Sequence, residues 1–207
     1  MRHRAPRLVV SLLLALGLLA GCASAEVKPT RSERARDYYP LAVGNRWVFR
    51  VKPAPPGQDR QEVRILSKDA DGFFVSNVGT RLAARSTGIF DGDRFLLEEP
   101  LETGHDWLAV PSVSTVERYR IIGTGVLINV PAGSFSDCVQ VEIEQPITAR
   151  DGRSGRLLGV WTYAPGVGPV HFVQRVELDG VPATTNAEYA LVEFDLVAGA
   201  EKAAPEG

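Results

Sequence analysis

Apolar and polar residues alternate along most of this chain from residue 46 to residue 197. Residues 139–144 read VQVEIE and residues 62–65 read EVRI, so every second side chain is apolar. A period of two places successive side chains on opposite faces of an extended strand, one face packed and the other in water. The pattern therefore predicts a series of half-buried β-strands.

Turn signals separate these apolar runs. Asp-Gly pairs stand at residues 71–72, 151–152 and 179–180, and a further Asp-Gly-Asp turn covers residues 91–93. Such pairs between alternating runs are typical of β-hairpins, and the glycines at 123 and 125 predict a break between two strands. We therefore expect an all-β fold, an antiparallel meander that forms a curved open sheet, a half-barrel or a barrel after an N-terminal signal helix.

The N-terminus has a different pattern. Three arginines precede residues 8–20, a run of 13 residues in which Ser11 is the single polar member. A membrane span needs about 20 apolar residues, so this run suits the apolar region of a signal peptide instead. It ends in LLAGC at residues 18–22, which resembles the lipobox of bacterial lipoproteins. The alternative is an ordinary secretory signal in which Cys22 falls near the cleavage site by chance.

The lipobox resemblance implies that residues 1–21 are a lipoprotein signal peptide and that the Cys22 thiol carries a diacylglycerol. Two or three acyl chains are enough to hold a protein stably on a membrane. Ala23, rather than an aspartate, follows the cysteine. By resemblance to lipoproteins of double-membraned bacteria, this residue favours the outer membrane, at its periplasmic face or at the cell surface.

Removal of the signal peptide leaves 20 basic and 25 acidic residues, a formal charge of −5. This balance argues against a nucleic-acid partner. Residues 22–36 are predicted to be a flexible tether, 37–197 one antiparallel β domain and 198–207 a disordered tail. With Cys22 on lipid, Cys138 has no internal partner, so the fold must rest on its apolar core rather than on disulfides.

Three segments resemble one family when taken together. Residues 38–49 read YYPLAVGNRWVF, residues 130–141 read VPAGSFSDCVQV and residues 161–170 read WTYAPGVGPV. They resemble a family of uncharacterised β-rich bacterial lipoproteins and secreted proteins with the patterns YFPLxxGNxW, VPAGxFxxCxxV and WYAPGVGxV. The resemblance implies an antiparallel β fold akin to the open half-barrels of lipoprotein-carrier proteins, and it implies no activity.

The same segments have direct structural interpretations. Residues 43–45 suit a tight turn before a strand whose Trp47 faces the core, and residues 164–166, Ala-Pro-Gly, suit a type II turn. Phe135 is predicted to fill the core ahead of the strand that holds Cys138. We interpret these motifs as fold signals rather than ligand contacts.

Candidate chemical groups are few. Cys138 would need a base and a lowered pKa to act as a nucleophile, and its apolar neighbours predict a small buried side chain instead. His105 with Asp106, joined by His171, could form a metal or acid–base site, but the spacing matches no zinc motif. We therefore expect no catalytic residue, no metal and no cofactor.

The remaining signals are acids and aromatics. Glu142 and Glu144 alternate along one strand, which favours a solvated face over a glycosidase pair. Most aromatic residues are expected in the core, and in an open curved sheet some would line an apolar groove. The sequence thus predicts a lipid-anchored envelope protein with a non-catalytic binding or structural role, whose partner is the membrane and an envelope protein or lipid. The alternative is a module that handles lipids or lipoproteins in an apolar groove.

Overall fold

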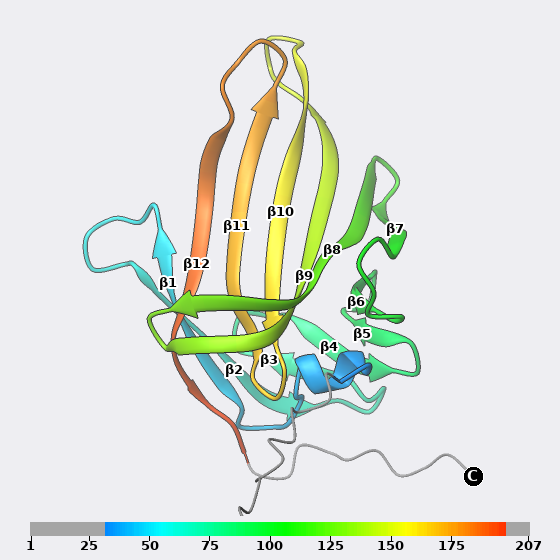
Figure 1. The fold of residues 1–207 in the computed structure, drawn as a ribbon, viewed down its shortest axis with the longest axis vertical. Coiled ribbons are helices and arrows are strands. Elements are labelled where there is room, and N and C mark those ends of the chain that lie inside the picture. The colour runs from blue at the N-terminus through cyan, green and yellow to red at the C-terminus, as the bar shows by residue number, and fades with distance from the viewer. Residues whose placement is uncertain (1–31, 198–207) are drawn as a thin grey trace, which may run out of the picture. The chain divides into compact units, whose positions relative to one another are not determined.

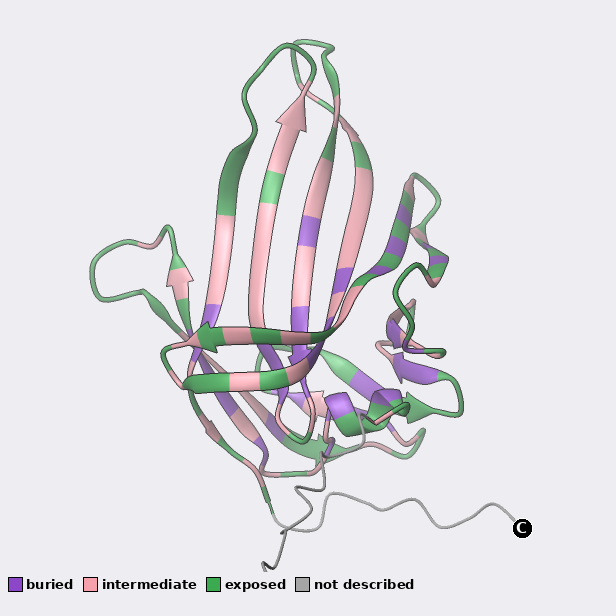
Figure 2. Ribbon diagram, viewed as in Figure 1, coloured by how far each residue is buried: buried purple, intermediate pink, exposed green. Residues whose placement is uncertain are grey.

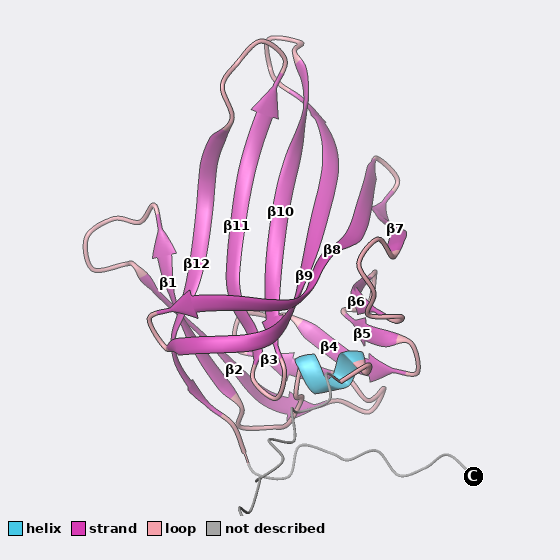
Figure 3. Ribbon diagram, viewed as in Figure 1, coloured by secondary structure: helices cyan, strands magenta, loops and turns pink. Residues whose placement is uncertain are grey.

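The computed structural model describes residues 32–197. The predicted signal peptide of residues 1–21, the predicted lipidation site Cys22 and the predicted tail of residues 198–207 lie outside this range. Twelve strands and one 3₁₀ helix make up the described part (Figure 3). Their bounds are η1 Ala35–Tyr38, β1 Arg46–Lys52, β2 Arg60–Lys68, β3 Phe74–Ser76, β4 Arg81–Arg85, β5 Gly88–Phe90, β6 Phe95–Glu98, β7 Asp106–Ser112, β8 Thr115–Val130, β9 Gly133–Thr148, β10 Ser154–Ala164, β11 Gly168–Leu178 and β12 Thr184–Asp195.

All twelve strands belong to one antiparallel sheet in the order β6-β5-β4-β3-β2-β1-β12-β11-β10-β9-β8-β7. Consecutive strands therefore lie side by side, as in a meander, except for β6 and β7 at the two edges, and the first strand β1 pairs with the last strand β12. The predicted all-β antiparallel fold is confirmed. In the described range, no helix has both the length and the apolar character needed to cross a membrane.

The sheet curves into a nearly closed barrel, with β6 and β7 as its two edges. Side chains bridge these edges where no strand ladder does. The indole Nε1 of Trp107 in β7 donates a hydrogen bond to the carbonyl oxygen of Phe95 in β6 at 2.9 Å. Arg94, directly before β6, forms an ion pair at 2.8 Å with Glu117 of β8. The seam between the edges is thus closed by an indole and an ion pair.

The longest strands correct one expectation. The sequence predicts a break at Gly123 and Gly125, but β8 continues through both glycines for 16 residues and pairs with an equally long β9. The register of this pair shifts three times between Ile121 and Ile128, as at β-bulges. Gly125 has a positive φ of 68°, a conformation that only glycine adopts at little cost. The glycines therefore bend one strand instead of ending it.

This bend carries the outer part of the β8–β9 hairpin across the sheet (Figure 1). At its tip, the backbone N–H of Ala132 donates to the carbonyl of Leu191 in β12 at 3.0 Å. The ring of Phe135 packs against Phe194 with centroids 6.1 Å apart. Phe135 is half-buried and lies inside β9, so it covers the core from the hairpin rather than filling it from a loop.

The buried residues gather where the β8–β9 hairpin crosses the sheet. Figure 2 shows buried residues gathered toward the end of the sheet where η1 and the β8–β9 hairpin lie, and intermediate exposure along the far halves of the long strands. The short helix η1 is part of the buried end, because Ala35 and Tyr38 are both fully buried. The backbone N–H of Ala35 donates to Oε1 of Glu99 at 2.8 Å. The packed core therefore occupies one end of the sheet.

Candidate functional site

A cavity of about 430 Å³ lies on the inward face of the curved sheet. This volume is within the range of roughly 300–1,000 Å³ that is usual for small-molecule sites. Its walls are mainly apolar and aromatic, and they come from nearly every long strand. The lining residues are Tyr39, Trp47, Phe49, Gln61, Val63, Val78, Thr80, Leu82, Asp91, Arg94, Leu96, Glu117, Tyr119, Ile143, Gln145, Leu157, Gly159, Trp161, Tyr163, Pro169, Phe172, Gln174 and Tyr189.

The floor of the cavity consists of three buried aromatic rings. Tyr39 meets Trp47 edge-on at 5.8 Å and Tyr163 at 6.1 Å between ring centroids. Burial raises the pKa of both tyrosines far above the ordinary value, so the phenols stay neutral. The floor is thus buried and uncharged, which suits the apolar end of a ligand.

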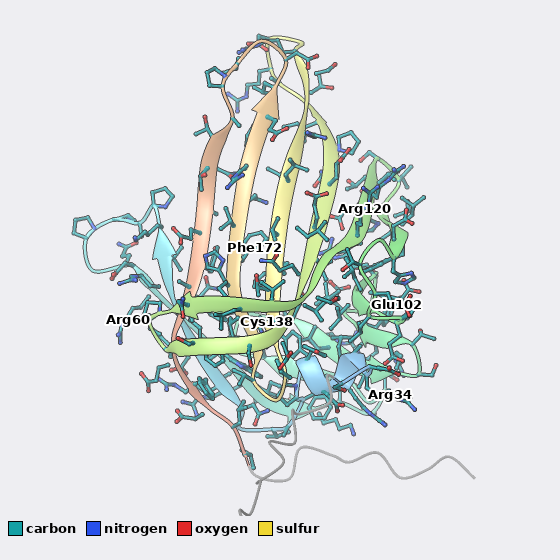
Figure 4. All side chains as sticks on the ribbon, viewed as in Figure 1. Arg34, Arg60, Glu102, Arg120, Cys138 and Phe172 are labelled. Atoms are coloured by element: carbon teal, nitrogen blue, oxygen red, sulfur yellow. The ribbon has the colours of Figure 1, made fainter. Side chains whose placement is uncertain are left out.

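One wall is a stack of half-buried aromatics on β10, β11 and β12. Trp161 stacks on Phe172 with centroids 4.4 Å apart, and Phe172 lies 5.9 Å from Tyr189. Figure 4 labels Phe172 midway along β11. Gly159 of β10 makes this stack possible, because a Cβ at that position would lie 2.9 Å from the Phe172 ring. The glycine therefore lets the aromatic ring lie across the neighbouring strand.

The opposite wall carries the charged groups of the cavity. Nε of Arg94 donates to Oδ2 of Asp91 at 3.0 Å, and its Nη1 donates to both carboxylate oxygens of Glu117 at 2.8 Å. The hydroxyl of Tyr119 donates to Oε2 of Glu117 at 2.7 Å. Burial raises the pKa of Tyr119, and the hydrogen bond to Glu117 raises it further, so this phenol also stays neutral. We call Asp91, Arg94, Glu117 and Tyr119 the polar wall.

The side chains farthest from the floor are glutamines and one leucine. Gln145 of β9, Leu157 of β10 and Gln174 of β11 all lie on the inward face and are half-buried. Gln61 of β2 also lines the cavity, and it too is half-buried. Along β10 the order Tyr163, Trp161, Gly159, Leu157 thus leads from the closed floor toward solvent. The cavity is apolar at depth and polar at its rim, as expected for an amphipathic ligand.

The three segments that resemble the β-rich lipoprotein family meet at the floor. The Trp47 indole donates to the carbonyl of Val167 at 2.7 Å, which joins the first segment to the third. The Tyr38 hydroxyl donates to the carbonyl of Asp137 at 3.0 Å, which joins the first segment to the second. The predicted turns are present, since Asn45 N–H donates to Ala42 O and Val167 N–H to Ala164 O. These segments therefore act as structural junctions around the cavity.

Cys138 is buried in β9 and does not line the cavity. Burial, together with the nearby Asp137, raises the pKa of its thiol from 9.0 to about 11. A thiol with a raised pKa holds little thiolate at neutral pH and is a poor nucleophile. The interpretation of Cys138 as a small buried side chain fits this environment.

We expect Cys138 in the native chain to react with iodoacetamide at pH 8 about a hundredfold more slowly than in the urea-unfolded chain, because the thiolate fraction falls tenfold per pKa unit. Stability should also fall as the pH rises from 9.0 toward 11. In that window the unfolded state loses its thiol proton first and the native state keeps it, so the unfolded state binds fewer protons. Comparable native and unfolded labelling rates, by mass spectrometry, would show an accessible reactive thiol.

The structure separates the histidines considered for a metal or acid–base site. His171 of β11 lies 3.2 Å from a carboxylate oxygen of Glu188 on β12. His105 directly precedes β7, and the centroid of its ring lies 5.5 Å from that of Trp107. Its buried Nε2 has no hydrogen-bond partner within residues 32–197. Across that same range, no three histidine, cysteine, aspartate or glutamate side chains gather as a metal site would require.

The alternating acids are on the outward face. Glu144 of β9 is paired in register with Arg118 of β8 and forms an ion pair with Arg156 of β10 at 3.5 Å. Arg156 and Glu144 also line a second hollow of about 580 Å³ beside the β9–β10 and β11–β12 turns. This hollow is larger but shallow, because most of its lining residues are exposed. The aromatic cavity is therefore the better candidate site.

The sequence offered an apolar groove lined by aromatic residues only as an alternative, for the case of an open curved sheet, and Trp47, Phe49, Trp161, Tyr163 and Phe172 do line the cavity. It did not identify the polar wall. A signal was present, because Glu117 stands two residues before Tyr119 and so shares the inward face of β8 with it. A carboxylate on the buried face of a strand indicates a partner from elsewhere in the chain.

No protein-family model matches this chain, and no curated protein matches it. Two solved structures resemble it: a "putative exported protein with YmcC-like fold" from Bacteroides fragilis NCTC 9343 and a "putative lipoprotein" from Parabacteroides distasonis ATCC 8503. Each is 13% identical in sequence to this chain, with a TM-score of 0.39. Each match covers 76% of this chain and 98% of the matched structure's chain. Likeness at this level assigns no activity, and the family with the three sequence patterns stays a prediction.

Proposed function

We propose that this chain is a lipid-anchored envelope protein that binds the acyl chain of a lipid or another amphipathic molecule in the aromatic cavity. The anchor would be the acylated Cys22, and the place of action the outer membrane, at its periplasmic face or at the cell surface. No catalytic step is part of the proposal. The cavity of about 430 Å³ with aromatic walls is the observation that carries it.

The cavity favours binding over a purely structural role. A structural module gains stability by filling its interior, because each void removes packing contacts. Here, half-buried aromatic side chains such as Trp161, Phe172 and Tyr189 border empty space instead of packing fully. Such surface remains costly in water and is stabilised when an apolar ligand covers it. A ligand is therefore the simplest account of this unfilled interior.

Filling the cavity at its rim tests the proposal. Leu157 lies on the inward face of β10, so Leu157→Trp should place an indole inside the cavity. We expect the lipid that stays bound to the full chain after purification from membranes to fall about tenfold, the change that a loss of 1.4 kcal/mol in binding produces. The measurement is mass spectrometry of solvent extracts, normalised to protein.

Leu158 supplies the matched control. It is the next residue of β10, is also half-buried and does not line the cavity. Leu158→Trp should leave the bound lipid unchanged, while both variants keep the wild-type circular dichroism spectrum. Equal lipid content in the two variants, or no lipid above background in the wild type, would contradict an acyl-binding cavity.

A further inference from the structure

The polar wall points to the chemical class of the ligand, on the basis of the proposed function. We propose that Arg94 donates hydrogen bonds to a neutral carbonyl oxygen of the ligand, so that the cavity takes acyl esters or amides in preference to free fatty acids. The apolar chain would lie along the aromatic wall, and the carbonyl would face Arg94.

The first step is the set of donors on Arg94. A guanidinium has five N–H groups. Nε–H points to Asp91, and Nη1 donates to both carboxylate oxygens of Glu117, so Nε and Nη1 are engaged. Nη2 has no hydrogen-bond partner among the residues that the structure describes, and Arg94 lines the cavity. Two donors are therefore left for a ligand or for water.

The second step is the charge of the polar wall. Asp91, Arg94 and Glu117 are the charged residues of the cavity lining, so two carboxylates surround one guanidinium with a formal charge of −1. The Glu117 side chain is 10% exposed and that of Asp91 16% exposed, so water screens them weakly. An anionic headgroup at Arg94 would meet both carboxylates at short range in a medium of low dielectric constant.

The third step compares candidate headgroups. A fatty-acid carboxylate would gain the Nη2 donors but would add a third negative charge to the polar wall. An ester or amide carbonyl accepts the same N–H groups and adds no charge. An ammonium headgroup has no acceptor for Nη2 and would face a cation at close range. The neutral carbonyl is therefore the group that fits both the donors and the charge.

Photo-crosslinking in phospholipid nanodiscs compares these classes on the native, acylated full chain. The probes are a long-chain fatty acid with a diazirine in its tail, its methyl ester and the corresponding primary amine. Crosslinked peptides are quantified by mass spectrometry. At pH 7.5 we expect peptides that contain Trp161 or Phe172 to be labelled about tenfold more by the ester than by the acid or the amine. The amine has no acceptor for the charged donor, and the acid adds a third negative charge beside two weakly screened carboxylates, so each should lose about a factor of ten.

Two variants test the polar wall itself. Glu117→Gln removes one carboxylate, so the acid probe should gain labelling relative to the ester, while the Tyr119 hydroxyl can still donate to the amide oxygen. Arg94→Lys keeps the charge but removes the planar set of donors, so labelling by the ester should fall about tenfold. Thermal unfolding of each variant reports whether the fold persists. The comparison of probes on the wild-type chain needs no variant.

The outcomes separate the two proposals. Labelling of the cavity by the acid or the amine at least as strongly as by the ester would overturn the ester preference and leave the acyl-binding function in place. If no probe labelled peptides of the cavity, the proposed function itself would fail. A ratio of acid to ester labelling that Glu117→Gln does not change would show that the polar wall does not select the headgroup.

Discussion

Replacing Trp47 with alanine is expected to lower the free energy of unfolding by about 3–5 kcal/mol, the usual cost of removing a large aromatic side chain from a core. Trp47 is 1% exposed and joins three parts of the fold. It packs on Tyr39, its indole donates to Val167 in the β10–β11 turn, and Gly168 lies against its ring. Removing the indole therefore releases the turn and the floor together. Urea denaturation followed by circular dichroism measures the change.

Trp161 is the matched control for this experiment. It is the same residue type in the same sheet, but it is half-buried and borders the cavity. Trp161→Ala should cost about 1–2 kcal/mol, in proportion to the smaller apolar area that leaves contact with the protein. If Trp47→Ala destabilised the chain no more than Trp161→Ala, the floor would not be the main structural junction. Trp47→Phe, which keeps a ring and loses the donor, separates packing from the hydrogen bond to Val167.

Period-two alternation predicted the strands that have one buried and one solvated face. In β9, Val139 and Val141 are fully buried and Ile143 lines the cavity, whereas Glu142 and Glu144 between and after them face outward. The Asp-Gly pairs were also sufficient for the turns between long strands. For example, Gly152 N–H donates to Ala149 O in the turn that joins β9 to β10. Local pattern and tertiary structure agree here because one sheet face is packed.

The alternation did not predict strands β7 and β4, because apolar and polar residues do not alternate in them. Residues 107–110 in β7 read WLAV, a continuous apolar run. Trp107 and Ala109 are buried, whereas Leu108 and Val110 are exposed at the edge of the sheet. In β4, the adjacent Leu82 and Ala83 are both buried. Burial on both faces, or apolar residues on an exposed edge, removes the period-two signal, so only the pairing in the folded sheet identifies these strands.

The site was less predictable than the fold for a related reason. Its residues are far apart in sequence, and the register of the sheet decides which of them meet. Arg94 directly precedes the edge strand β6, and Glu117 lies in β8, beside the opposite edge strand β7. They lie together because the sheet curves until its two edges face each other. Alternation identifies which face a side chain takes within its strand. It does not give the curvature that turns one face into a cavity.

Replacing Cys22 with serine is expected to abolish acylation of the chain. The sulfur of the Cys22 thiol is the atom that would carry the diacylglycerol. In the bacterial lipoproteins whose lipobox residues 18–22 resemble, a serine hydroxyl does not replace this thiol. Without two or more acyl chains, the protein loses the stable hold on a bilayer that a lipid anchor provides. Intact-mass analysis of the purified native product is the measurement. The wild type should begin at Cys22 and weigh more than its bare polypeptide by the mass of the attached lipid.

Cys138 provides the control, because it is the other cysteine of the chain and is buried in β9. Cys138→Ala should keep the full lipid mass and remain in the membrane fraction. Cys22→Ser should show no lipid mass, whether or not its signal peptide is removed. A wild-type product that retained Met1, or one that began at Cys22 with only the mass of its polypeptide, would contradict the anchor. The protein would then not be held at a membrane by an anchor on Cys22. A supply of lipid from an adjoining bilayer to the cavity would no longer follow from the proposed lipid anchor.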